Sequence, residues 1–350
     1  MTIQIKGTAA MQTNLHRKPV SKIVRFYNTG GPEVLKIEDA PSRELSKNEV
    51  SLRVQAMGLN RSEYLFMHGH YLEPTQLPAT LGYEASGVVT AVGANVDPSW
   101  LNKSVSTIPS FSLNQYGVLG TEAIVPVHAL AEYPSHLTPI EATSIWMQYM
   151  TAYGALVEIG HVKNGEFVLI TAASSSAGLA AIQTVKAEGA ISIATTRTRA
   201  KRDELLALGA DHVIVTDEED LAARVKDITC GAGARVIFDA IGGPLVDKLA
   251  EVAAPGATIF LYGVLSGTQT TFSVVPALQK ALSFRGYWLV ETVMNPETFA
   301  RGKNYVYDRL KTGQFKPKIA KTFPFEDVVK AYQYMESNDQ IGKIVLTVGE

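Results

Sequence analysis

The most informative scarcity in this 350-residue sequence is that of cysteine, of which Cys230 is the single example. One cysteine excludes an intramolecular disulfide framework and a zinc site built from several cysteines. Long apolar runs are also lacking, since none approaches the ~20 residues of a transmembrane helix. Residues 1–22 contain no continuous apolar stretch of the secretory type. We therefore expect a cytoplasmic protein with no membrane partner.

The sequence also has no surplus of charge of one sign. Lysine and arginine number 32 against 34 for aspartate and glutamate, which gives a formal net charge of −2. A nucleic-acid binder needs a basic face, so this balance argues against such a partner and leaves a small molecule as the expected one. At roughly 100–200 residues per domain, the length predicts about two domains.

Short strands separated by turns are the pattern between residues 22 and 127. Residues 1–21 are polar and mixed, and we expect them to form a loose N-terminal arm. Gly, Pro, Asn and Asp punctuate the apolar stretches, as is typical of an irregular β-rich unit. The predicted strands are 22–27, 34–38, 49–57, 85–92, 103–108 and 121–125.

From residue 140 the pattern changes to strands alternating with helices. An apolar helix is expected at 140–159, before strands at 166–171, 191–195, 212–215, 236–239, 258–262 and 284–289. Six strands with five crossovers predict a doubly wound parallel sheet. Beyond it we expect helices at 296–312 and 325–336 and strands at 318–323 and 343–348. The fold class is thus α/β, with a β-rich catalytic domain (22–139 and 290–350) interrupted by a doubly wound domain (140–289).

The turn after the first of these parallel strands is rich in small residues. It contains Ser175, Ser176 and Gly178, where the dinucleotide fingerprint has mostly glycines. Small side chains let the backbone approach a pyrophosphate at the helix N-terminus, and serine hydroxyls can donate to it. An ordinary serine-rich loop is the alternative.

The end of the second parallel strand indicates which dinucleotide would bind. An NAD-binding domain places an acidic residue about 20 residues past the turn, where this chain has Thr195 and Thr196. Cationic residues gather instead at the start of the next helix: Arg197, Arg199, Lys201 and Arg202. A solvated charge run is possible, but the placement favours the 2′-phosphate of NADPH.

Several segments resemble the medium-chain dehydrogenase/reductase superfamily. They are the Gly-Tyr-Glu-x-x-Gly motif within Leu81–Gly93 and the segments 58–63, 150–156 and 342–346. The resemblance implies a GroES-like catalytic domain interrupted by a Rossmann domain, and a homodimer formed through an edge of the Rossmann sheet.

Two departures separate the chain from the zinc dehydrogenases of that superfamily. Asn60 stands at the position of their first zinc cysteine, and Tyr83 at that of their zinc histidine. The sequence therefore resembles the zinc-free branch, which implies no metal and hydride transfer from NADPH to a quinone or α,β-unsaturated carbonyl. The alternatives are an enoyl-thioester reductase of lipid or polyketide assembly, an NADPH-binding crystallin-like or scaffold protein, and a zinc enzyme using His68 and His70.

The resemblance also assigns residues to roles. Tyr71 is the leading proton donor with a structural role as its alternative, Tyr64 is a secondary donor, and Asn60 holds the nicotinamide or the substrate carbonyl. Glu63 and Glu84 are expected to be structural, and Trp146, Gln148 and Tyr149 are further candidates for facing the substrate. The expected cofactor contacts are Asn60, Thr151, Ser175, Ser176, Ala177, Arg197, Thr198, Lys201, Thr216, Ala240, Ile241, Tyr262, Gly263, Trp288 and Asn338.

Overall fold

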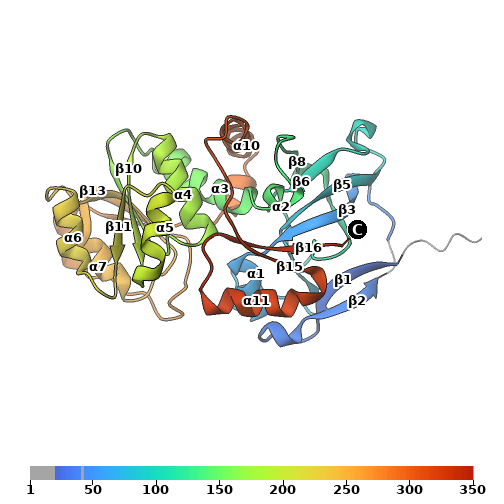
Figure 1. Cartoon of the computed structure of the whole chain (residues 1–350), viewed down its shortest axis with the longest axis horizontal. Coiled ribbons are helices and arrows are strands. Elements are labelled where there is room, and N and C mark those ends of the chain that lie inside the picture. The colour runs from blue at the N-terminus through green and yellow to red at the C-terminus, as the bar shows by residue number, and fades with distance from the viewer. Residues whose placement is uncertain (1–19, 41–42, 350) are drawn as a thin grey trace, which may run out of the picture.

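The computed structural model describes residues 20–40 and 43–349, which form two lobes lying side by side (Figure 1). One lobe is built on a six-stranded sheet, and the other on a seven-stranded and a three-stranded sheet. Most of the predicted N-terminal arm (1–21) lies outside the described residues. The first strand, β1, begins at Ser21.

The six-stranded sheet is parallel and has the strand order β11-β10-β9-β12-β13-β14. Its central strands are nearly all buried, because helices cover both faces. The doubly wound expectation is confirmed, because the strand order reverses between β9 and β12. The strands are β9 (Phe167–Ile170), β10 (Ile191–Thr196), β11 (His212–Val215), β12 (Ala234–Asp239), β13 (Ala253–Leu261) and β14 (Ser283–Gly286). The helices are α4 (Ser176–Ala187), η5 (Arg199–Lys201), α5 (Arg202–Ala207), α6 (Leu221–Ile228), α7 (Leu245–Val252) and α8 (Val274–Lys280).

The second lobe contains the start and the end of the described chain. β16 (Lys343–Thr347) pairs antiparallel with β3 (Glu49–Gly58) and parallel with β15 (Ile319–Pro324), so the predicted return to the β-rich domain is confirmed. The rest of this sheet is β5 (Glu84–Val92), β6 (Ser104–Thr107), β7 (Glu122–Pro126) and β8 (Leu130–Glu132). The small sheet is β1 (Ser21–Phe26), β2 (Lys36–Ala40) and β4 (Ala79–Thr80). The helical segments are η1 (Pro32–Val34), α1 (Arg61–Met67), η2 (Pro98–Trp100), η3 (Val127–Ala129), η6 (Phe325–Asp327) and α11 (Val328–Ser337).

Helices connect the lobes, and here the structure differs from the predicted helix at 140–159. The segment divides into α2 (Pro139–Ala142), α3 (Trp146–Ala152) and the π-helical η4 (Tyr153–Ile159). A Cβ on Gly154 would lie 2.0 Å from the hydroxyl oxygen of Tyr287. A distant segment of the chain therefore approaches the helix closely in its π-helical part. No local sequence period reports such a contact.

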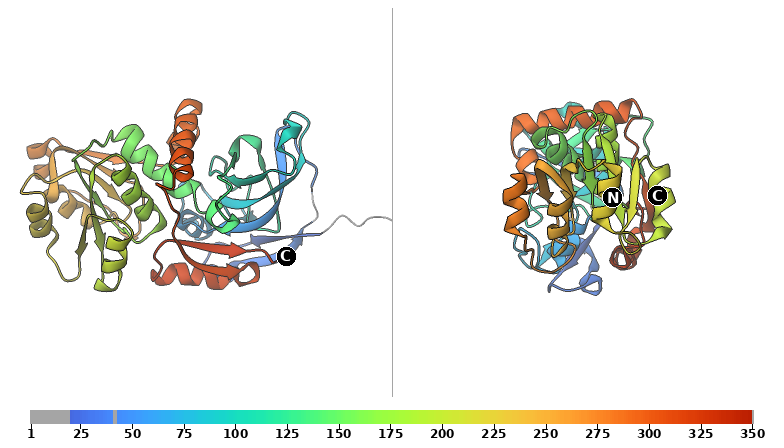
Figure 2. Two further views of the ribbon diagram at one scale, coloured as in Figure 1. Left: turned by 45° about the horizontal axis from the view of Figure 1, so that its top comes forward. Right: turned by 90° about the vertical axis from the view of Figure 1, so that its left-hand side faces the viewer.

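Two further helices, α9 (Val290–Val293) and α10 (Pro296–Lys311), stand between the lobes (Figure 2). Side chains of α10 share a core with α3 and α4, and the chain joins the seven-stranded sheet only at β15. That point lies later than residue 290, where the sequence pattern placed the boundary.

One predicted strand begins later than expected. Pro32 starts the turn η1, so the strand expected at 34–38 forms at Lys36–Ala40 instead. β4 and β8 were not predicted, because two or three residues are too short for a period to register. Within the described ranges, no helix has the length and hydrophobicity needed to cross a bilayer.

Candidate functional site

A cavity of about 640 Å³ lies at the carboxyl ends of β9, β10 and β12 and extends between the lobes. Ligands of doubly wound sheets bind at this position, where the strand order reverses. With the exception of Tyr64, every residue that the sequence assigned to catalysis or cofactor binding lines this cavity. The structure therefore brings together residues that are spread from Asn60 to Asn338.

The loop between β9 and α4 forms one end of the cavity. The Ser175 hydroxyl caps α4 by accepting a hydrogen bond from the Gly178 N–H at 3.0 Å. The Ala177 N–H makes no hydrogen bond to any described residue, whereas the Ser176 N–H faces Gly342 in a parallel bridge, and both residues line the cavity. A Cβ on Gly178 would lie 2.6 Å from the Ala173 Cα, so glycine is needed for this close turn. Free N–H groups at a helix N-terminus suit a phosphate.

The predicted cations after β10 are in different situations. Arg197 is exposed and lines the cavity, and its guanidinium has no hydrogen-bond or ion-pair partner among the described residues. The Lys201 ammonium donates to the carbonyls of Asn338 at 2.6 Å and Gln340 at 3.0 Å, and to the Ser174 hydroxyl at 3.3 Å. Because an ammonium has three N–H groups, Lys201 has no donor left for a phosphate in this arrangement.

Four buried polar atoms in the cavity wall lack a hydrogen-bond partner among the described residues. They are Ser62 Oγ, Gln148 Oε1, Gln340 Oε1 and the hydroxyl oxygen of Tyr262, an expected cofactor contact. An unpaired buried polar atom costs free energy, so these atoms indicate where a polar ligand completes the structure. Gln148 was a sequence candidate, whereas Ser62 and Gln340 were missed because no motif marks them.

Tyr71 lies in the wall where the two lobes meet. Its hydroxyl oxygen accepts a hydrogen bond from Trp288 Nε1 at 3.2 Å. The Tyr71 O–H donates to no described residue, so its hydrogen is free for a ligand in the cavity. Burial raises the pKa of Tyr71 above its usual value, so the proton is retained at neutral pH.

Asn60 connects the cavity wall to a buried ion pair. Its side-chain amide donates to the Gly58 carbonyl at 3.2 Å and to Glu63 Oε1 at 3.0 Å. Its carbonyl oxygen accepts from Lys343 Nζ at 2.6 Å, and the same ammonium lies 2.5 Å from Glu84 Oε2. Asn60 therefore has its donors committed to the protein and only one carbonyl lone pair left.

Glu63 is a fully buried carboxylate with four hydrogen-bond donors. They are the Asn60 N–H and side-chain amide, the Tyr83 N–H at 2.9 Å and the Tyr332 hydroxyl at 2.8 Å. Burial raises the pKa of Glu63, and these donors oppose that shift. An acid O–H would find no acceptor here, so the arrangement matches the ionised form and a structural role.

Three of the sequence candidates lie away from the cavity: Tyr64, Trp146 and Tyr149, whose hydroxyl donates to Gln183 Oε1 at 3.0 Å. The Tyr64 hydroxyl donates to Glu336 at 3.0 Å, which does not fit its predicted role as a second proton donor. The Trp146 indole N–H donates to the Ser106 hydroxyl at 2.8 Å, and its ring does not reach the cavity. Adjacent residues of a helix point in different directions. The sequence did not show which of residues 146–149 face the cavity.

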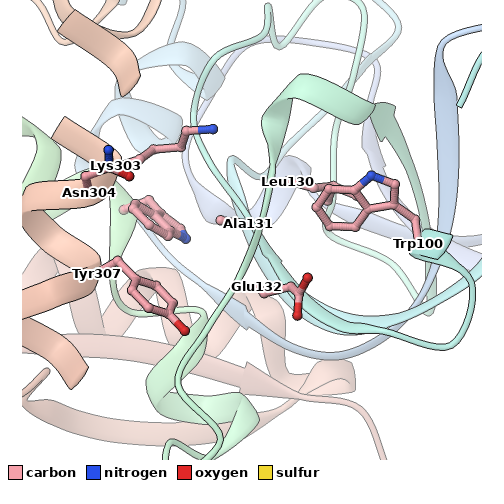
Figure 3. A pocket seen from close by; sticks show the side chains of 8 residues that line it. Trp100, Leu130, Ala131, Glu132, Lys303, Asn304 and Tyr307 are labelled. Carbon is pink, nitrogen blue, oxygen red and sulfur yellow. The ribbon is translucent and has the colours of Figure 1, made fainter. Parts of the chain in front are cut away.

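Trp146 lines a second, more open hollow of about 400 Å³ between the lobes (Figure 3). Its walls are formed by side chains from η2, β8 and α10: Trp100, Leu130, Ala131, Glu132, Lys303, Asn304 and Tyr307. Among these residues the sequence offered none as a candidate.

Metal ligands are the last feature to consider. In the described part of the chain, no three His, Cys, Asp or Glu side chains come close enough to hold a metal ion. His68 Nδ1 lies 2.8 Å from the Tyr64 carbonyl, away from Glu63 and Glu84, so the zinc alternative has no support from the donor set.

Comparison with known proteins agrees with this geometry. The family model of the alcohol dehydrogenase GroES-like domain matches residues 46–135, and that of zinc-binding dehydrogenases matches residues 177–302. A 2-haloacrylate reductase of Burkholderia sp. is 29% identical over 327 residues, 92% of this chain and 97% of the relative. Quinone oxidoreductase 1 of Escherichia coli (strain K12) is 27% identical over 92% of this chain and 98% of its own.

A solved structure extends the similarity to three dimensions. The Escherichia coli quinone oxidoreductase complexed with NADPH superposes with a TM-score of 0.85 at 27% identity, covering 93% of this chain and 99% of that one. The two matched domain models, the strand order and these relatives agree. The chain belongs to the medium-chain dehydrogenase/reductase superfamily, in its branch of quinone oxidoreductases and enoyl reductases.

Proposed function

We propose that this protein is a zinc-independent oxidoreductase that uses NADPH to reduce a quinone or an α,β-unsaturated carbonyl compound. The observation that carries the proposal is one cavity that joins a phosphate-binding end at Ser176 and Arg197 to a hydroxyl donor at Tyr71. The 2-haloacrylate reductase and quinone oxidoreductase relatives support the same substrate classes.

The residues present fit NADPH. The free N–H of Ala177 at the start of α4 suits the pyrophosphate, and the unpartnered Arg197 guanidinium suits the 2′-phosphate. The orphan oxygen of Gln148, one turn before Thr151, can accept from a carboxamide. When bound, the dihydronicotinamide supplies a hydride, that is, two electrons and one proton.

The chain's own residues would then manage charge and protons at the substrate. As the hydride reaches the β-carbon of an enone, an electron pair moves to the carbonyl oxygen. Tyr71 is placed to give its hydroxyl proton to the substrate and to recover one from solvent. A conjugated acceptor spreads the developing charge, which suits a site whose donors are hydroxyls and amides rather than a metal.

The experiment that tests this function is an NADPH-consumption assay over quinones, short and long enones, and enoyl thioesters. Turnover of quinones or enones that survives treatment with a chelator supports the proposal. Preference for enoyl thioesters would instead favour a role in lipid or polyketide assembly. NADPH binding without oxidation by any of them would favour a cofactor-binding scaffold.

We also propose that two copies associate through the β14 edge of the parallel sheet. β14 pairs only with β13, and none of the side chains of the adjacent α8 is buried. Val274, Val275 and Leu278 of α8 are 57%, 62% and 76% exposed. Contiguous exposed apolar residues beside an open strand edge are typical of an interface.

A further inference from the structure

Lys343 is a buried ammonium in the wall of the substrate cavity that has no role in the chemistry described so far. Its side chain is 1% exposed, and the residue lines the cavity. The backbone makes room for it: a Cβ on Gly58 would lie 2.7 Å from Lys343 Cε. Burying an ammonium is costly unless it is paired, so its place beside the cavity calls for a reason.

The hydrogen bonds of this ammonium leave one donor over. Lys343 Nζ donates to Asn60 Oδ1 at 2.6 Å and to Glu84 Oε2 at 2.5 Å, and no other described residue accepts from it. An ammonium carries three N–H groups and no acceptor. One charged N–H is therefore available to a ligand in the cavity.

The charges around Lys343 are arranged with the positive one toward the cavity. Asn60 and Lys343 line it, whereas Glu63 and Glu84 are fully buried behind them and do not. The Glu63 charge is met by its four donors, and the second oxygen of Glu84 accepts from the Met147 N–H at 2.9 Å. Of these three charged residues, Lys343 is therefore the one that lines the cavity.

We propose that the free N–H of Lys343 hydrogen-bonds the substrate carbonyl oxygen and stabilises the negative charge that develops there during hydride transfer. This proposal rests on the proposed function. As the β-carbon gains the hydride, the carbonyl π-electrons move to oxygen, and the Lys343 N–H bond to that oxygen strengthens without proton loss. Tyr71 supplies the proton that completes the reduced product. Asn60 and Glu84 act as positioning residues that fix the ammonium.

The sequence motif gives an independent reason to look here. Asn60 occupies the position that resembles the zinc cysteine of the metal-dependent relatives, and Lys343 Nζ lies 2.6 Å from its side chain. A fixed ammonium thus stands beside the place where those enzymes put their cation. It supplies positive charge for an oxyanion without any metal ligand.

The test uses Lys343→Met together with the double variant Lys343→Met/Glu84→Gln. The single variant removes the charge but leaves a buried carboxylate unpaired, so we expect it to lose stability for that reason alone. The double variant removes both charges and restores a neutral, well-filled site. We expect the double variant to melt near the wild-type temperature and to bind NADPH normally, yet to show a kcat about 100-fold lower, the usual loss for one oxyanion donor.

A second readout needs no turnover. 4-Nitrophenol is added to the protein with NADP⁺, and its visible phenolate absorbance is titrated against pH. The wild-type protein should bind the phenolate below the pH at which the free phenol ionises, and the double variant should not. The control is Lys280→Met. The Lys280 ammonium donates to three protein carbonyls and lies outside the cavity.

The outcomes separate the two proposals. Wild-type turnover of enones with a double variant within twofold of the wild-type kcat would overturn the role of Lys343 and leave the proposed function standing. A phenolate signal that depends on Lys343 in a protein that reduces none of the substrates would support Lys343 and overturn the function. No phenolate signal in the wild-type protein also counts against Lys343.

Discussion

Tyr71 shows how much of a catalytic residue is decided by its immediate partners. Its oxygen accepts a hydrogen bond from Trp288 across the lobe boundary. That donor leaves the Tyr71 proton free for a substrate to take. Trp288 and the Tyr83 hydroxyl lower the pKa of Tyr71, although burial, the larger effect, keeps this pKa above its usual value. We therefore expect activity limited by Tyr71 to be flat with pH until the alkaline range.

Replacing Tyr71 by phenylalanine removes this proton and little else. We expect Tyr71→Phe to lower kcat about 100-fold, the lower end of the range for a general acid, while the Kd for NADPH changes less than twofold. Steady-state kinetics and fluorescence titration measure the two quantities. Tyr64→Phe is the matched control, because the Tyr64 hydroxyl bonds Glu336 outside the cavity. Equal kinetics for the two variants would return Tyr71 to a structural role.

Arg197 is the unpartnered cation at the other end of the cavity. We expect Arg197→Ala to weaken NADPH binding by about 10- to 100-fold, because one charge-assisted contact is lost, and to leave NADH binding nearly constant. Paired titrations of both cofactors measure the difference. Arg199→Ala is the control, since Arg199 already pairs with Glu218 at 2.6 Å. Equal losses for NADPH and NADH would refute the 2′-phosphate role.

Sequence reasoning proposed residues that carry a local motif and missed those defined by distant partners. Ser175, Arg197 and Tyr71 were proposed because each lies in a recognisable segment, and all three line the cavity. Lys343 lies in the motif at 342–346, but its partners Asn60 and Glu84 lie 283 and 259 positions away in the sequence. Gln340 and Ser62 are notable only for oxygens without partners, which no sequence displays.

At the scale of elements, the parallel strands were predicted to within a few residues. Buried strands such as β10 and β12 are continuous apolar runs, and Gly189, with φ 71°, marks the end of α4. The failure at 140–159 has a different origin. That segment is mostly apolar, and within its π-helical part Gly154 packs against Tyr287 from another element. Periodicity reports burial, and the contact that breaks a helix is tertiary.

Helix α8 carries a prediction about assembly. We expect Leu278→Asp and Val275→Asp to convert a homodimer into a monomer, because each places a charge in an interface that would otherwise bury apolar area. Light scattering coupled to size exclusion measures the mass. Leu101→Asp, at a 40% exposed leucine of the other lobe, is the control. A monomeric wild-type protein would contradict the proposed interface directly.

The start of β3 predicts a dependence of stability on pH. The Arg43 guanidinium hydrogen-bonds Glu49 and lowers the pKa of that carboxyl from 4.5 to about 2, helped by the Ser46 N–H. A depressed pKa stabilises the fold above pH 4.5, and the contribution is lost as pH falls toward 2. Because Arg43 is half-exposed, we expect Arg43→Gln to cost about 1 kcal/mol at neutral pH. Urea unfolding should show this difference closing below pH 4; a constant difference would contradict it.

For the molecule as a whole, the important contact is the one that ties the two lobes at the cofactor loop. The Lys201 ammonium, in the nucleotide-binding lobe, holds the carbonyls of Asn338 and Gln340 in the chain leading back to β16. Beside it, the Gly342 N–H donates to the Ser174 carbonyl at 2.9 Å. The loop that would hold pyrophosphate is thus bonded to the strand that carries Lys343. This junction would therefore link cofactor binding to the position of the Lys343 ammonium.

Lys201→Met tests this coupling against direct recognition of the 2′-phosphate. If Lys201 holds the lobes together, the variant should lower the melting temperature by a few degrees and weaken NADPH and NADH equally. Calorimetry and paired titrations measure both effects, with the exposed Lys226→Met as the control. A loss confined to NADPH would mean that Lys201 leaves the two carbonyls for the phosphate when the cofactor binds. In that case the contact of Lys201 with Asn338 and Gln340 would break when the cofactor binds.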